Sequence, residues 1–172
     1  MVAAVVLAAG AATRYGAPKQ RLLVDEVVRR VQASTVDAVV VVTGAYEIET
    51  AAAVVRCDRW EEGPGASLRC GLEALPPGTE AAVVVLADGP DLAPQAVDRV
   101  IEAWRAGLGD VLSAAYGGVR GHPVLLARAV WDAVPPEGAR ALDPVLVPCD
   151  DLGAPGDVDY PEDLPQRLRE ES

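Results

Sequence analysis

Three short runs of almost wholly apolar residues constrain the fold of this chain more than any other feature of its sequence. They occupy residues 2–7, 38–42 and 81–86. Apolar runs of this length are typical of strands that are buried on both faces, as in parallel sheets. Helical patterns lie between the runs. Strands that alternate with helices predict an α/β fold of three layers around a mostly parallel sheet.

The rest of the chain continues this alternation. Shorter strands are expected at residues 110–114, 123–126 and 145–148, and helices at residues 26–33, 48–54, 67–75, 94–105 and 161–169. No linker, internal repeat or low-complexity tract interrupts the pattern, and a length of 172 residues suits one domain with a sizeable core. We therefore expect residues 1–172 to fold as a single domain.

The net charge of −11 narrows the classes of partner. Nonspecific binding to nucleic acid or to an anionic membrane needs a basic surface, so neither a nucleic acid nor a membrane is expected as a partner. No apolar stretch is long enough to span a membrane, and the first strand lacks the basic flank of a signal peptide. We expect a cytoplasmic protein, in which Cys57, Cys70 and Cys149 are reduced thiols.

The loop after the first strand carries the single lysine of the chain, Lys19, together with Arg14 and two glycines, Gly10 and Gly16. It matches neither the Gly-x-Gly-x-x-Gly dinucleotide fingerprint nor the P-loop. Glycine lets the backbone approach phosphate oxygens, and Arg14 and Lys19 can neutralise a triphosphate. Loops at the carboxyl ends of parallel strands share one crevice, so we expect this loop to lie beside Asp88, which follows the third strand.

Five segments, in a fixed order along the chain, resemble the motifs of one known family. They are Leu7-Ala8-Ala9-Gly10 with Arg14, Gly16, Pro18 and Lys19; residues 63–72 with Ser67; Leu86-Ala87-Asp88-Gly89-Pro90; Arg120-Gly121-His122-Pro123-Val124; and Asp157-Val158-Asp159-Tyr160-Pro161-Glu162-Asp163. Together they resemble the MobA-like NTP transferase group of nucleotidyltransferases, and within it most closely the molybdenum cofactor cytidylyltransferases (MocA-like). The resemblance runs from one end of the chain to the other.

The resemblance implies a Rossmann-like nucleotidyltransferase fold and a Mg²⁺-dependent enzyme. Such an enzyme moves a nucleoside monophosphate from an NTP onto a phosphate of a small molecule and releases pyrophosphate. For MocA-like enzymes the acceptor is molybdopterin, and a molybdenum hydroxylase is the implied protein partner. The Leu-Ala-Ala-Gly form of the first motif resembles cytidylyltransferase relatives and favours CTP over GTP.

The resemblance also implies roles for individual residues. The catalytic residues would be Lys19, Arg14 and Asp88, and Mg²⁺ would be held by Asp88 and Asp159, with Asp157 as a second candidate. The nucleotide would be bound by Leu7, Ala8, Ala9, Gly10, Arg14, Lys19 and Ser67, and the acceptor by Arg120, Gly121, His122 and Arg140. We expect His122 to shape the acceptor pocket, since in-line transfer does not require a general base. Arg140 either contacts the acceptor phosphate or lies on the surface.

The sequence departs from the family pattern at a few positions. Gly89 stands where the family has glutamine, and the segments after Leu23 and after Arg140 are short. These departures concern acceptor recognition more than triphosphate binding. They leave two alternatives open: a nucleotidyltransferase that acts on a sugar phosphate or another small phosphate, and a non-catalytic chaperone for molybdenum cofactor. The retained basic and acidic site residues favour the enzyme, and the shortened segments favour the chaperone.

Overall fold

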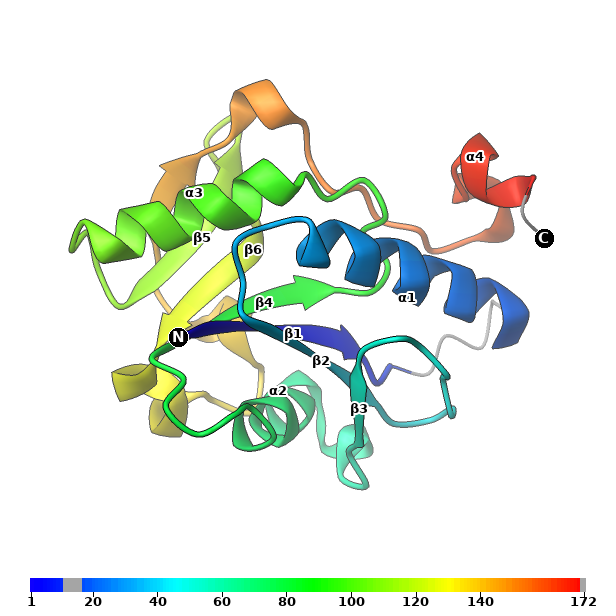
Figure 1. Ribbon diagram of the computed structural model, residues 1–172, viewed down its shortest axis with the longest axis horizontal. Coiled ribbons are helices and arrows are strands. Elements are labelled where there is room, and N and C mark those ends of the chain that lie inside the picture. The colour runs from blue at the N-terminus through cyan, green and yellow to red at the C-terminus, as the bar shows by residue number, and fades with distance from the viewer. Residues whose placement is uncertain (11–16, 171–172) are drawn as a thin grey trace.

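The computed structural model describes residues 1–10 and 17–170, and for residues 17–20 and 161 it describes the backbone alone. A seven-stranded sheet forms the centre of the molecule (Figure 1), with strand order β3-β2-β1-β4-β6-β5-β7. The strands are β1 (Val2–Ala8), β2 (Ala38–Thr43), β3 (Ala53–Arg56), β4 (Ala81–Leu86), β5 (Val111–Tyr116), β6 (Val119–Ala127) and β7 (Val145–Pro148). The α-helices are α1 (Ala17–Gln32), α2 (Pro64–Glu73), α3 (Pro94–Arg105) and α4 (Gln166–Arg169).

Strand direction confirms the expected α/β class. β4, β1, β2 and β3 are parallel neighbours, and β7 is parallel to β5. β6 is antiparallel to both β4 and β5. Among the described strands, β6 therefore runs against the other six, and the sheet is mostly parallel.

Helices cover both faces of the sheet and give it three layers. Figure 1 shows α1 and α3 on one side and α2 on the other. Alternate residues of β1 enter the two cores: Val6 packs in the core under α1 and α3, and Val5 packs in the core under α2. This alternation follows from the two-residue period of a strand, and it explains why the first apolar run has no polar positions.

Two expected helices are wrong. Residues 48–54 do not form a helix; the edge strand β3 begins at Ala53 instead, and Val55 pairs with Val42 of β2. The terminal helix is interrupted, because a 3₁₀ turn, η5 (Pro161–Asp163), is followed by the four-residue α4. Pro165 lies between them, and a proline disfavours helical backbone at the residue before it.

Several elements begin earlier than expected, among them α2, which begins at Pro64 rather than at residue 67. α1 begins at Ala17 rather than at residue 26, and β6 begins at Val119 rather than at residue 123. The first two residues of β6, Val119 and Arg120, pair with Tyr116 and Ala115 of β5 across the turn at Gly117 and Gly118. Both glycines have positive φ, which is the backbone conformation that glycine adopts without steric cost.

The cysteine prediction is also wrong. Cys57 and Cys70 form a disulfide with a Cα–Cα distance of 5.8 Å, and Cys149 is a buried free thiol. Cys57 follows the unexpected strand β3, which lies beside β2 and brings it next to α2. The pairing therefore depends on a strand that the sequence pattern did not predict.

None of the helices in residues 1–10 and 17–170 is long and apolar enough to cross a membrane.

Candidate functional site

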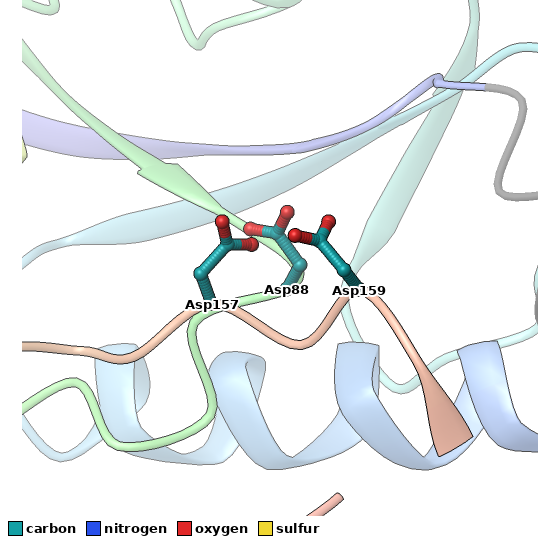
Figure 2. A group of neighbouring side chains, drawn as sticks. All are labelled: Asp88, Asp157 and Asp159. Carbon is teal, nitrogen blue, oxygen red and sulfur yellow. The ribbon is translucent and has the colours of Figure 1, made fainter. Parts of the chain in front are cut away.

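Three aspartates converge at the carboxyl edge of the sheet. Asp88 follows β4, while Asp157 and Asp159 come from the segment between β7 and α4. Figure 2 shows the three side chains grouped together, and a carboxylate oxygen of each lies within 4.8 Å of one from each of the others. Asp88 is partly buried, whereas Asp157 and Asp159 are exposed. The structure thus brings together the three residues for which the sequence predicts a metal-binding role.

Val158 explains why its two neighbours face the same way. Its backbone N–H donates to the Asp88 carbonyl oxygen at 3.0 Å, which aligns this segment with the loop after β4. Its side chain is buried with Leu23, Leu164 and Leu168. Side chains alternate along an extended chain, so the carboxylates on either side of a buried Val158 point away from that apolar cluster and toward Asp88.

The charges at this site oppose one another. Burial, and then the neighbouring Asp157 and Asp159 carboxylates, raise the pKa of Asp88 to about 7. Like charges this close disfavour full ionisation, and a divalent cation reverses that preference. Three carboxylate oxygens within reach of one another are the donor set that a hard cation such as Mg²⁺ or Mn²⁺ takes. The residues present therefore fit a divalent metal ion.

The start of the first loop lies next to the end of β4, which Asp88 follows. Leu7 and Leu86 are paired residues of β1 and β4, and the Ala87 N–H donates to the Leu7 carbonyl oxygen at 3.1 Å. Leu7 and Ala8 are partly buried, and Ala9 is buried. Gly10 is exposed at the end of the described loop. Arg14 lies outside the described residues, and so does the side chain of Lys19, whose backbone belongs to α1.

Ser67 lies on the other side of the sheet, in α2. It is buried near the helix start, where Pro64 occupies the first turn. The helix approaches the sheet closely because of Gly71: a Cβ there would lie 2.5 Å from Cγ1 of Val5. Packing thus fixes Ser67 beside the half of the sheet that contains β1 and β2.

A cleft of about 600 Å³ opens beside Asp88, on the side of β4 that faces β6 and away from β1. It lies between the end of β4, the β5–β6 hairpin and residues 154–157, and its lining includes Arg120, Gly121 and His122 together with Asp88 and Asp157. Arg140 does not line the cleft; it is an exposed residue of the 3₁₀ turn η3 (Ala139–Ala141). Three of the four expected acceptor residues are therefore placed beside the aspartates.

The basic side chains of His122 and Arg120 line the cleft, the first constrained by burial and the second by hydrogen bonds that it already makes. Burial, and next the positive charge of Arg120, lower the pKa of His122 to about 4, so its imidazole is neutral at pH 7. The guanidinium of Arg120 donates to the Leu142 carbonyl oxygen at 2.9 Å and to that of Ala139 at 3.3 Å. Arg120 thus connects the short segment around Arg140 to β6.

The sequence did not identify the apolar and aromatic wall of this cleft. Leu92, Tyr116 and Val119 line it, and Val119 is 68% exposed. The Tyr116 hydroxyl donates to the His122 carbonyl oxygen at 2.8 Å, which fixes the ring across the hairpin. No motif marks these residues; the β5–β6 pairing places Tyr116 and Val119 beside Arg120, and Leu92 comes from the loop after β4.

Comparison with known protein families gives a match over most of the chain. Residues 4–142 match the family model described as a MobA-like NTP transferase domain. Asp157 and Asp159 lie beyond the matched residues. No curated protein matches the sequence.

Solved structures share the fold at low sequence identity. A homologue of Mycobacterium tuberculosis Rv0371c, from Mycobacterium sp. strain JC1, is 24% identical with a TM-score of 0.76, and covers 98% of this chain and 96% of its own. A manganese complex of Rv0371c from M. tuberculosis is 24% identical with a TM-score of 0.67, covering 98% and 97%. The 4-diphosphocytidyl-2C-methyl-D-erythritol synthase of Anaerococcus prevotii is 15% identical with a TM-score of 0.66, covering 95% and 94%.

Proposed function

The chain belongs to the family of MobA-like NTP transferase domains, and on that premise we propose that it is a Mg²⁺-dependent nucleotidyltransferase. It transfers CMP from CTP to the phosphate of a small molecule, molybdopterin, and releases pyrophosphate. The observation that carries the proposal is the convergence of Asp88, Asp157 and Asp159 between the loop after β1 and the cleft. A metal held by these carboxylates would lie between the proposed nucleotide and acceptor sites.

The nucleotide is proposed to bind on the β1 side of the aspartates. Backbone from Leu7 to Gly10 surrounds the phosphates, and Arg14 and Lys19 neutralise the triphosphate and the departing pyrophosphate. Ser67 contributes to the pocket for the base. The choice of CTP is supported by the Leu-Ala-Ala-Gly sequence and by the fold shared with an enzyme whose name includes a diphosphocytidyl product.

The metal is proposed to bind to Asp88 and Asp159, with Asp157 as a further ligand. A divalent cation supplies charge neutralisation at phosphate oxygens. The likeness in fold to a protein whose structure was solved in complex with manganese supports the binding of a divalent ion.

The acceptor is proposed to occupy the cleft. Arg120, Gly121 and His122 orient its phosphate so that an oxygen attacks the α-phosphorus in line with the leaving pyrophosphate. An acceptor phosphate is already ionised at neutral pH, so no side chain needs to remove a proton. A neutral His122 fits this role, because it shapes the cleft without titrating near pH 7. Arg140, outside the cleft, would contact at most a part of the acceptor that projects beyond it.

Thermal unfolding with CTP, GTP, ATP and UTP, each with and without Mg²⁺, tests the nucleotide site. CTP at 100 times its Kd should add about 2.7 kcal/mol of stability, and Lys19→Ala should abolish this gain. Pyrophosphate release with molybdopterin and with sugar phosphates then identifies the acceptor. Binding of molybdopterin without any pyrophosphate release would favour the chaperone instead. If no nucleotide at millimolar concentration shifts the Tm, the proposal that the chain is an active nucleotidyltransferase is refuted.

A further inference from the structure

We propose that Arg167, in α4, is a positioning residue for the Asp157 and Asp159 carboxylates. It fastens the chain that follows them to the loop after Asp88 and to α1. The inference rests on the metal site of the proposed function and adds a residue that lies beyond the residues matched by the family model.

The Arg167 guanidinium joins three separate segments. One of its nitrogens, Nη2, donates to a carboxylate oxygen of Asp91 at 2.7 Å and to the Pro90 carbonyl oxygen at 3.0 Å. Its Nε lies 3.5 Å from a carboxylate oxygen of Glu26 in α1. Asp91 also ties back to the metal-binding segment, because its N–H donates to the Pro155 carbonyl oxygen at 2.8 Å.

Glu26 is the fixed point of this arrangement. Its side chain is 8% exposed, and it accepts hydrogen bonds from Arg30 at 2.7 Å and from Arg29 at 2.9 Å. Burial alone would raise the pKa of Glu26, but the bonds from Arg30 and Arg29 outweigh it and lower the pKa. Arg30 in turn donates to the Leu92 carbonyl oxygen at 3.1 Å. A buried carboxylate needs such partners to remain ionised, so Glu26 holds α1, the loop after β4 and α4 together.

An apolar contact completes the attachment on the other side of the segment. Val158, between the two exposed aspartates, is buried against Leu23 of α1 and against Leu164 and Leu168. α4 has four residues, too few for a helix that is stable by itself. Its position therefore depends on this apolar cluster and on Arg167.

The need for a fastening follows from the charges it restrains. Asp157 and Asp159 are exposed, and their carboxylate oxygens lie within 4.8 Å of one another and of Asp88, so full ionisation of the three groups favours separation while no cation is bound. Arg167 acts outside the site and opposes that separation. It keeps the oxygens within reach of one cation and so lowers the cost of assembling the ligand set.

Mn²⁺ binding, measured by electron paramagnetic resonance on the full chain, tests the proposal. Arg167→Met should weaken Mn²⁺ binding by about tenfold, the lower end of the effect of residues that orient metal ligands. Arg167→Lys should recover part of the affinity, because it keeps the charge and loses the planar fork. Arg105→Met, an exposed arginine at the far end of α3, is the matched control and should bind like the wild type.

Turnover distinguishes positioning from general destabilisation. In Arg167→Met, the Mg²⁺ concentration for half-maximal activity should rise about tenfold, while kcat at saturating Mg²⁺ changes little. If Arg167→Met does not fold, Asp91→Asn removes the carboxylate at 2.7 Å and should weaken Mn²⁺ binding in the same direction.

The outcomes separate this inference from the proposed function. Wild-type affinity for Mn²⁺ in a folded Arg167→Met or Asp91→Asn protein would overturn the positioning role and leave the metal site standing. A wild-type protein that binds no Mn²⁺ would overturn both.

Discussion

Replacing Asp88 by asparagine should stabilise the metal-free protein while abolishing its response to metal. Asp88 has an ordinary pKa of 3.8 that rises to about 7 in the folded protein. A carboxyl group whose pKa is raised on folding stabilises the folded protein when the pH is below the unfolded-state pKa. This stabilisation is lost as the pH rises through the folded-state pKa. Above pH 7 the folded protein therefore carries the full free-energy cost of an ionised Asp88, and Asp88→Asn removes that cost.

The structure sets the size of this gain. At about 1.4 kcal/mol for each pKa unit, the rise from 3.8 to about 7 corresponds to a ceiling of about 4 kcal/mol. Asp157 and Asp159 are exposed, so water screens their part of the repulsion, and we expect about 2 kcal/mol. For a chain of this length that is a rise in Tm of about 4–8 °C.

Thermal unfolding at pH 8 and pH 4, in EDTA and in Mg²⁺, measures both effects. At pH 8 in EDTA the variant should be the more stable protein, and at pH 4 the difference should shrink. Mg²⁺ should raise the Tm of the wild type and leave Asp88→Asn unchanged. Asp110→Asn is the matched control, since this exposed aspartate precedes β5 at the opposite edge of the sheet. An Asp88→Asn protein that is less stable than the wild type at pH 8 in EDTA would refute the reasoning.

Three further predictions concern the surroundings of the site. The pKa of His122 is lowered to about 4, so its contribution to stability is present above pH 6.5 and is lost as the pH falls toward 4. The unfolding free energy of the protein should therefore fall between pH 7 and pH 5, and in His122→Gln this fall should be smaller by about 2 kcal/mol. Both proteins should be compared in the Asp88→Asn background, because Asp88 titrates with the opposite sign in the same pH range. Equal slopes of unfolding free energy against pH, with and without His122→Gln, would contradict the prediction. Gly71→Val should lower the unfolding free energy by about 2 kcal/mol in urea, since its Cβ would lie 2.5 Å from Val5; an unchanged midpoint would show that the sheet yields freely. Cys70→Ser should cost about 3 kcal/mol in the same assay by opening the loop to Cys57, and the two proteins should become equally stable in reductant.

The parts of the fold that the sequence predicts well depend on local pattern. β4, α3 and β7 have the expected bounds, because each is an unbroken apolar or amphipathic run with a clear stop. The sequence predicts that the loop at Leu7 lies beside Asp88 if β1 and β4 are parallel neighbours, and the structure shows that they are. The bounds of β4, α3 and β7 need no information from distant residues.

The parts that the sequence does not predict depend on distant neighbours. β3 has mostly exposed residues and is a strand only because β2 offers it a partner edge. The Cys57–Cys70 disulfide then depends on β3. Arg167 and Glu26 are separated by most of the chain, and each alone has the pattern of an ordinary charged helix residue. Only the folded chain shows that they meet.

The topology also explains why the proposed nucleotide and acceptor sites lie on separate sides of the aspartates. The chain passes from β1 outward to β2 and β3, then returns to place β4 on the other side of β1, so a switch point lies between β1 and β4. Ligands of α/β sheets bind at such points, beyond the carboxyl ends of the strands. β6 runs the other way, and its beginning, with Arg120 and His122, therefore lies at the same edge as the ends of β1 and β4. One antiparallel strand thus brings a hairpin wall to the carboxyl edge, and the carboxylates lie between that wall and the first loop.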